Sequence, residues 1–175
     1  MKLETERLIL RPLEAGDIDA MHSFWGNAEN MSFFPEPLAR EAVAGIIEKH
    51  GRLAREQGLG IWAVLLKETG ALIGDCGITI QCIDGEDRHE IGYHFHRDHW
   101  GRGYATEAAQ AMKRYGFEKL RLKQLFSYME DRHEKSRRVA ERNGMSLWKT
   151  FANPRNRDLP TTVYSISLAE YTATT

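Results

Sequence analysis

The sequence predicts an α+β (mixed α/β) domain whose central sheet is mixed but mostly antiparallel, with about seven strands flanked by about four helices. Its 175 residues suit one domain with a single sizeable core. Turns at Thr69-Gly70 and Asp84-Gly85-Glu86-Asp87 join strand-like segments, and short turns make antiparallel neighbours. A strand, helix, strand passage further on needs one parallel pair. No repeat, low-complexity segment or linker interrupts residues 1–175, so we expect a single domain.

The first part of the chain is expected to hold one strand and two helices. Residues Arg7–Leu13 alternate in part between polar and apolar, which is typical of a strand. Asp17 is expected to cap a helix that runs to about Trp25. Two prolines make residues 33–37 a loop, because proline breaks regular structure. A longer helix from about Ala39 to Gln57 carries apolar residues at helical spacing.

Six strands and two helices are expected in the rest of the chain. Three strands in series come first, at Ile61–Lys67, Ala71–Gln81 and Arg88–His96. A loop with two glycines then leads into a helix that ends near Leu120. The last elements are a strand at Lys123–Met129, a helix at Glu134–Asn143 that Gly144 stops, and strands at Met145–Ala152 and Thr161–Leu168.

Composition excludes several classes of partner. The formal net charge of −1 gives no bulk attraction for nucleic acid or an anionic membrane. No apolar run approaches the roughly 20 residues that span a bilayer, and the first residues lack the apolar core of a signal peptide. Cys76 and Cys82 lie six residues apart in one strand, about 20 Å when extended, which is too far to bridge. We therefore expect reduced thiols and a cytoplasmic protein.

The most informative segment contains Gly101 and Gly103, where a strand is expected to give way to a helix. Glycine allows a tight turn and lets a ligand approach the backbone amides closely. The first N–H groups of a helix have no intrahelical partner and carry partial positive charge, and Arg102 adds a cation. The segment therefore predicts a ligand with a pyrophosphate. It lacks the third glycine of a dinucleotide fingerprint and the Gly-Lys-Ser/Thr of a Walker loop.

These segments together resemble the GNAT superfamily of N-acetyltransferases, and within it the ribosomal-protein N-terminal (RimJ/RimL-type) branch. The loop of that superfamily has the pattern Gln/Arg-x-x-Gly-x-Gly/Ala. Gly103 and Ala105 match its fourth and sixth positions, and Trp100 stands in the first, where tryptophan is familiar in this branch. The resemblance implies the GNAT acyl-CoA N-acyltransferase fold and acetyl-CoA as cosubstrate, and it covers nearly the whole chain. Its motifs are Glu6–Pro12, Glu90–Tyr93, Trp100–Ala108, Ser136–Val139 and Asn143–Met145.

The resemblance also implies which residues bind the cofactor. The 101–105 loop would hold the pyrophosphate, and the end of the third strand, near Phe95, would pair with the amide-bearing arm. That strand is expected to splay from Lys123–Met129 so that the arm inserts between them. His133 replaces an asparagine that binds the arm in the family. The expected cofactor-binding residues are Phe95, Trp100, Gly101, Arg102, Gly103, Tyr104, Ala105, Thr106 and His133.

Two residues are candidates for catalysis of direct attack by a primary amine in a ternary complex. Glu90, on the cofactor strand, is the candidate general base, acting through a water; the alternative is a surface carboxylate paired with a cation. Ser136 is the candidate acid, because Ala140 stands where many members carry a proton-donating tyrosine. The alternatives are that Ser136 bonds the backbone and that water donates the proton.

Substrate contacts are expected from Phe33, Phe34 and His94. In the family, the first two helices and their joining loop cover the acceptor site, which places the two phenylalanines there, although core packing is the alternative. His94, His96 and His99 suggest a zinc site, but no fourth ligand accompanies them, so no metal is expected.

The leading hypothesis is therefore an acetyl-CoA-dependent N-acetyltransferase, with a protein N-terminal amine or a small amine as acceptor. One alternative is an acyl-CoA-binding regulatory or sensor module of the same fold with little catalysis, because His133 and Ala140 depart from the family pattern. Another is a regulator that binds a different phosphate ligand at the glycine loop. A homodimer is open, since dimers are the commonest association.

Overall fold

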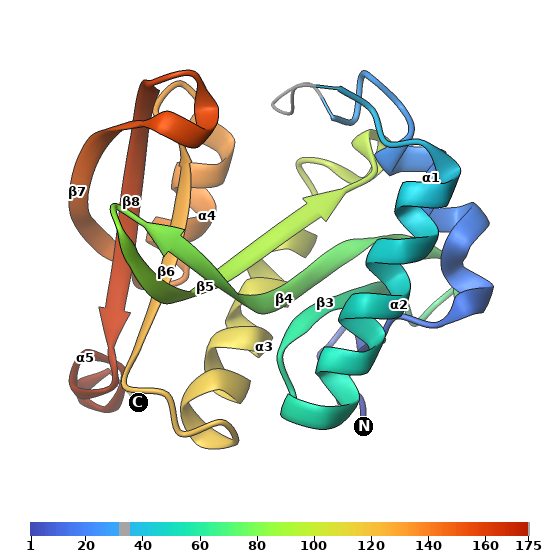
Figure 1. Ribbon diagram of the computed structural model, residues 1–175. Coiled ribbons are helices and arrows are strands. Elements are labelled where there is room, and N and C mark those ends of the chain that lie inside the picture. Colours follow the sequence, from blue (N-terminus) through green and yellow to red (C-terminus); the bar gives the residue numbers. More distant parts are fainter. Residues whose placement is uncertain (32–35, 175) are drawn as a thin grey trace.

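The eight strands in the described part of the protein form one sheet in the order β1-β2-β3-β4-β5-β6-β8-β7 (Figure 1). The computed structural model describes residues 1–31 and 36–174. The strands are β1 (Leu3–Glu4), β2 (Leu8–Pro12), β3 (Gly60–Leu66), β4 (Leu72–Ile83), β5 (Glu86–Phe95), β6 (Gln124–Glu130), β7 (Ser146–Asn153) and β8 (Leu159–Ser167). The helices are α1 (Ile18–Trp25), α2 (Arg40–Gln57), α3 (Tyr104–Glu118), α4 (Glu134–Arg142) and α5 (Leu168–Ala173).

Every neighbouring pair of strands is antiparallel except β5 and β6, which are parallel. The predicted class, a mixed and mostly antiparallel α+β sheet, is confirmed. The two elements that the sequence did not indicate are short. β1 has two residues, and α5 has six and begins with a capping box in which Ser167 and Glu170 bond each other's backbone N–H.

Two local predictions need correction. Asp17 stands at the N-cap position of α1, as expected, but its side chain makes no cap hydrogen bond; its carboxylate instead accepts two hydrogen bonds from Arg11 and one from the N–H of Glu14. The second hairpin turn is the two-residue Asp84-Gly85, with φ of 51° and 84°, so β5 begins at Glu86 rather than Arg88. Asp-Gly is the preferred pair for such a turn, because both residues need positive φ.

The helices cover both faces of the sheet (Figure 1). On one face α3 packs against β4, β5 and β6; on the other α1 and α2 pack against β3 and β4. Ile91 and Phe95 of β5 belong to the core that includes the buried residues of α3. Because successive side chains of a strand point to opposite faces, Glu90, Gly92 and His94 face the α1 and α2 side.

Two further findings bear on the sequence analysis. Cys76 is buried and Cys82 is partly buried, and both are free thiols, as predicted. None of the described helices is long and apolar enough to cross a bilayer.

Gly77 provides a test of how tightly the centre of the sheet is packed. A Cβ at Gly77 would collide with the carbonyl oxygen of Gly60 on the neighbouring strand. We expect Gly77→Ala to lower the free energy of unfolding by about 2–3 kcal/mol, measured by urea denaturation. The matched control is Gly45→Ala in α2, where no described atom lies within 4 Å of the added Cβ. That control is expected to gain about 0.5–1 kcal/mol, and equal losses in both variants would contradict the close approach at Gly77.

Candidate active site

The site begins where β5 and β6 separate. Their register contains a single pair, Glu90 with Phe126. The N–H of His96 donates to the carbonyl of Ile73 on β4, so the alternation of an antiparallel ladder directs the peptide groups of Tyr93 and Phe95 away from β4. The peptide groups of Tyr93 and Phe95 therefore point toward β6, which does not pair with them. This is the predicted splay of the two strands.

A row of backbone N–H groups lies just beyond the end of β5. Gly101 and Gly103 have φ of 76° and 82°, a region that glycine occupies without strain, and α3 begins at Tyr104. Within the described part of the chain, no N–H from Gly101 to Thr106 has an acceptor; the first intrahelical bond is donated by Glu107. Six consecutive donors at a helix N-terminus form a site suited to an anion such as a diphosphate.

The N-terminal segment braces this loop through Arg7 and Glu107. The Glu107 carboxylate accepts hydrogen bonds from Thr5 Oγ1 at 2.6 Å, the Arg7 N–H at 2.8 Å and Arg7 Nε at 2.7 Å. Arg7 Nη1 also donates to the carbonyl of Arg102 at 3.0 Å, and the guanidinium lies 4.6 Å from the Tyr104 ring centroid. Neither Arg7 nor Glu107 had a predicted role, although both lie in motifs that carry the family resemblance.

A hollow of about 390 Å³ adjoins the braced loop. Its lining combines the N-terminal segment, the first turns of α3 and the end of α4: Glu6, Arg7, Gly103, Thr106, Glu107, Gln110 and Arg142. The hollow therefore lies beside the row of free amides, with two guanidinium groups in its wall.

The Glu107 brace predicts a pH-dependent contribution to stability. Burial alone would raise the pKa of Glu107, but hydrogen bonds from Thr5 and Arg7 outweigh it and hold that pKa below its usual value. The contribution is therefore complete above the unfolded pKa of about 4.3 and is lost as the pH falls through the lower folded pKa. We expect Glu107→Gln to lower the free energy of unfolding at pH 7 by about 1.5–3 kcal/mol.

Thermal unfolding of wild type and Glu107→Gln is measured at pH 7 and at about pH 3. The difference in melting temperature between the two proteins should be smaller at about pH 3. The exposed turn residue Glu68 is the control, because it makes no hydrogen bond or ion pair with any described residue. A difference between Glu107→Gln and wild type that did not change with pH would contradict the role of the charge.

On the α4 side of the splay, Ser136 contacts Tyr93. Their hydroxyl oxygens are 2.9 Å apart, and the Tyr93 hydroxyl lies 3.1 Å from the Ser136 carbonyl oxygen. Burial raises the pKa of Tyr93 well above its ordinary value, so the phenol keeps its proton at neutral pH. Ala140, buried one turn later, supplies no polar group. Tyr93 lies in a motif of the family, but its pairing with Ser136 was not predicted.

His133 caps α4. Its Nδ1 accepts a hydrogen bond from the N–H of Ser136 at 3.1 Å, the role that asparagine often fills at a helix start. Burial lowers the pKa of His133, in keeping with a neutral ring.

The candidate base Glu90 lies partly buried in the middle of β5. Its carboxylate accepts a hydrogen bond from Thr79 Oγ1 at 3.2 Å, and it extends over Gly92, since a Cβ there would lie 3.0 Å from Oε2. Burial raises the pKa of Glu90 to about 7, although His94 and Thr79 act in the opposite direction. A carboxyl group that titrates near neutrality is suited to accept and release a proton at the pH of the cell.

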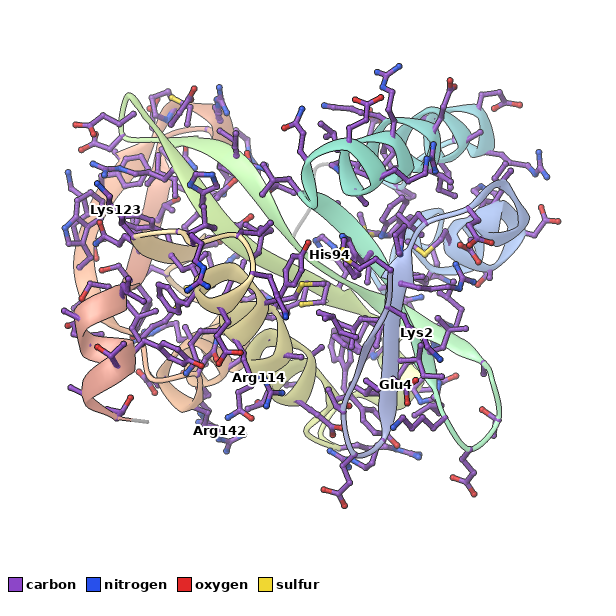
Figure 2. The ribbon with its side chains drawn as sticks, turned by 90° about the horizontal axis from the view of Figure 1, so that it is seen from below. Lys2, Glu4, His94, Arg114, Lys123 and Arg142 are labelled. Carbon is purple, nitrogen blue, oxygen red and sulfur yellow. The ribbon has the colours of Figure 1, made fainter. Side chains whose placement is uncertain are left out.

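His94 is held by a buried acid. Its Nδ1 lies 2.9 and 3.1 Å from the two carboxylate oxygens of Asp75, whose side chain is fully buried. Trp25 of α1 donates its indole N–H to the same carboxylate at 2.9 Å. Figure 2 shows His94 near the middle of the view, and its side chain is partly buried, whereas Arg114 and Arg142 are exposed. An acid within an otherwise apolar strand was the only sequence signal for Asp75.

The other predicted site residues fall in different places. Trp100 donates its indole N–H to the carbonyl of Phe95 at 2.7 Å, and Lys135 Nζ lies 4.7 Å from the Trp100 ring centroid. Phe33 and Phe34 lie outside the described residues, so their predicted contact with substrate stays a prediction. Among the described residues, no group of three or more His, Cys, Asp or Glu side chains is arranged to hold a metal ion.

Known proteins resemble this chain along nearly its full length. The sequence profile of the acetyltransferase (GNAT) domain matches residues 7–146. The uncharacterized N-acetyltransferase p20 of Bacillus licheniformis is 32% identical over 177 residues, which covers 97% of each chain. The crystal structure of an acetyltransferase from Agrobacterium tumefaciens is 32% identical and has a TM-score of 0.79, covering 95% of this chain and 94% of that one.

A more distant structure is that of the ribosomal-protein acetyltransferase RimL in complex with coenzyme A. It has a TM-score of 0.81 and covers 95% of this chain and 98% of that one, but only 16% of the residues are identical. That likeness shows a shared fold and nothing about the acceptor.

Proposed function

Because the chain belongs to the GNAT acetyltransferase family, we propose that it transfers an acetyl group from acetyl-CoA to a primary amine by direct attack in a ternary complex. The observation that carries the proposal is the row of six acceptor-free N–H groups at residues 101–106, which follows within a few residues a strand that pairs with β6 only at Glu90. This combination suits a ligand that has both a diphosphate and an amide-bearing arm.

In this proposal different residues bind different parts of the cosubstrate. The amides of residues 101–106 and the Arg102 side chain hold the pyrophosphate, and the braces from Arg7 and Glu107 keep the loop in shape. The peptide groups of Tyr93 and Phe95 align the arm, although Trp100 already occupies the Phe95 carbonyl. An arm that pairs there must use the remaining groups or displace the indole.

The proposed chemistry uses Glu90 on one face of β5 and the Tyr93–Ser136 pair on the other. Glu90 takes a proton from the acceptor ammonium, and the resulting amine attacks the thioester carbonyl while the carbon–sulfur bond breaks. The nitrogen of the product then loses its second proton to solvent, so one proton is released overall once the thiolate is protonated. Ser136, hydrogen-bonded to the protonated Tyr93 phenol, supplies a proton to the departing thiolate. The Tyr93–Ser136 pair thereby takes the place of the proton-donating tyrosine that many members carry at the position of Ala140. The carboxylates of Asp75 and Glu90 on the acceptor side favour a cationic amine.

The proposed acceptor is the N-terminal amine of a protein, because the motifs resemble those of the ribosomal-protein N-terminal acetyltransferase branch. The test incubates purified protein and acetyl-CoA with a panel of N-terminal peptides, polyamines, free amino acids and aminoglycosides, and measures thiol release. We expect release that depends on one class of amine, with mass spectrometry showing an acetyl group on its nitrogen. If only small amines are acetylated, the protein N-terminus is rejected as the acceptor, but the proposed acetyltransferase activity stands.

The acyl-CoA sensor remains a second candidate, because buried Ala140 stands where many members carry the proton donor. Binding of acetyl-CoA without thiol release for any amine would favour that reading. Thermal shifts with coenzyme A and with ATP test the nucleotide-binding alternative, since a ligand that binds the native state raises its stability. A shift with ATP alone would reject both acyl-CoA proposals.

A further inference from the structure

β5 and β6 also separate at the end opposite the candidate active site. Their register contains only Glu90 with Phe126, so no residue before that pair is in register with the other strand. A hollow of about 400 Å³ lies there, which is within the volume range of small-molecule sites. Its lining joins the start of β5 to the connection from α3 to β6 and includes Asp87, Arg88, Arg121, Lys123 and Phe126. We call it the β5–β6 hollow.

The lining of the β5–β6 hollow carries more positive than negative charge. Arg121 and Lys123 are exposed, and neither side chain makes a hydrogen bond or ion pair with any described residue. Arg88 is paired with Glu86 at 2.6 Å, so its charge is largely offset. Asp87 is the acid among the lining residues that the structure describes. Two unpaired cations thus outweigh one carboxylate, and the hollow attracts anions.

Arg88 is held in place by two aromatic rings. Its guanidinium lies 5.1 Å from the Phe126 ring centroid and 5.3 Å from that of Trp148. Nη2 donates to Glu86, and Nε is buried, whereas Nη1 has no partner among the described residues. Because the side chain is already ordered, a ligand that bonds to Nη1 loses little further side-chain entropy.

The backbone of Arg121 adopts a conformation that usually belongs to glycine. Arg121 follows the end of α3 with φ of 57°, in the left-handed region where helices commonly end on glycine. Any other residue costs about 1–2 kcal/mol there. The connection is nevertheless fixed, since the N–H of Leu122 donates to Gly116 and the carbonyl of Lys123 accepts from Leu168. The chain therefore has a cation at a position where glycine would fold at lower cost.

We propose that the β5–β6 hollow binds the phosphate group of a small organic phosphate. A phosphate monoester carries about −1.5 to −2 charges at pH 7 and has three acceptor oxygens, which matches two unpaired cations and one ordered guanidinium. Guanidinium groups also bind phosphate through two parallel hydrogen bonds. Figure 2 shows Lys123 on a different part of the molecule from Arg142, which lines the hollow beside the glycine loop. The inference therefore does not depend on the proposed function.

The first experiment follows backbone amide signals by NMR while inorganic phosphate is added, with chloride at equal ionic strength as the blank. Phosphate should shift the signals of residues 121–124 in a saturable way, and chloride should not. The signals of residues 101–106 report on the glycine loop separately in the same titration. Shifts confined to residues 101–106, or equal and non-saturating shifts with both anions at residues 121–124, would overturn the proposal.

Charge variants provide the second test, at an ionic strength of about 0.15 M, where charges are screened beyond about 8 Å. The double variant Arg121→Gln/Lys123→Gln should bind phosphate at least about 10-fold more weakly. Asp87→Asn removes a like charge and should tighten binding about two- to fivefold. Lys119→Gln is the matched control, because Lys119 is exposed in the same connection but does not line the hollow. Unchanged affinity in the double variant, or an equal loss in Lys119→Gln, would contradict the assignment.

A competing role for the two cations is to offset the negative end of the α3 dipole. In that case the double variant would unfold at a lower temperature while its phosphate titration matched that of wild type, and the proposal would be rejected. Weaker phosphate binding by a double variant that keeps the wild-type pattern of amide signals elsewhere supports the site. The gain expected in Asp87→Asn does not depend on the stability of the double variant.

The third experiment identifies the source of the phosphate group. O-phosphoserine, glucose 6-phosphate and AMP are titrated beside inorganic phosphate. Tighter binding of one monoester than of inorganic phosphate supports an organic phosphate, whereas tightest binding of the inorganic ion would reject it in favour of free phosphate. A single-stranded oligonucleotide that binds more tightly than every monoester, and loses that affinity in the double variant, would assign the hollow to nucleic acid and overturn the proposal.

Discussion

Gly103→Glu is expected to weaken binding of coenzyme A at least about 100-fold, or about 2.7 kcal/mol. Gly103 immediately precedes α3 with φ of 82°, where any side chain strains the backbone. Its Cβ would lie 3.4 Å from Nη2 of Arg7, within the braced loop. The new carboxylate would occupy the partial positive charge at the helix start and repel a diphosphate. Isothermal titration calorimetry with coenzyme A measures the effect.

The control for backbone strain is Gly70→Glu. Gly70 has φ of 70° in the turn between β3 and β4, and no described atom lies within 4 Å of an added Cβ. The two variants therefore share the strain and the charge but differ in position. Unchanged affinity in Gly103→Glu, or an equal loss in Gly70→Glu, would show that the loop does not bind the diphosphate.

Glu90→Gln is expected to lower kcat by about 100- to 1000-fold near neutral pH, which lies within the range for removal of a general base. In wild type, kcat should rise as the pH passes about 7, where Glu90 loses its proton. The variant must wait for the acceptor to ionise by itself, so its deficit should shrink as the pH approaches the pKa of the amine. Affinity for coenzyme A should not change.

Glu86→Gln is the control for the loss of a charge from the same strand, because Glu86 is exposed and pairs with Arg88. It should retain the rate and the pH profile of wild type. A wild-type profile in Glu90→Gln would remove Glu90 from the mechanism and leave proton removal to water.

Those parts of the fold that depend on neighbouring residues could be predicted from the sequence. Two hairpins follow from Thr69-Gly70 and Asp84-Gly85, and the end of α4 follows from Gly144, which has φ of 78°. Asp17 occupies the expected N-cap position of α1, but its side chain makes no cap bond because Arg11, on the preceding strand, binds its carboxylate. The short helix α5 was missed although Ser167 and Glu170 form a capping box, because its six residues give no periodic pattern.

The candidate site divides in the same way. Glu90, Gly92 and His94 share a face because a strand repeats every two residues, and this needs no knowledge of the fold. The partners of His94 come from far away in the sequence: Asp75 lies 19 residues earlier, and Trp25 lies a further 50 residues before that acid. Such contacts follow only from the packing of α1 onto the sheet. The sequence therefore predicts the reactive groups more readily than the residues that orient them.

The single registered pair between β5 and β6 also affects how the molecule stays together. Besides the contacts between β5 and β6, α3 joins the β1–β5 portion to the β6–β8 portion, since it contacts β2, β4, β5 and β6. A ligand that bonded to the facing edges of β5 and β6 would hold the two portions together. Its binding would therefore make the protein more resistant to unfolding and proteolysis. The lifetime of this protein would then follow the supply of its own cosubstrate.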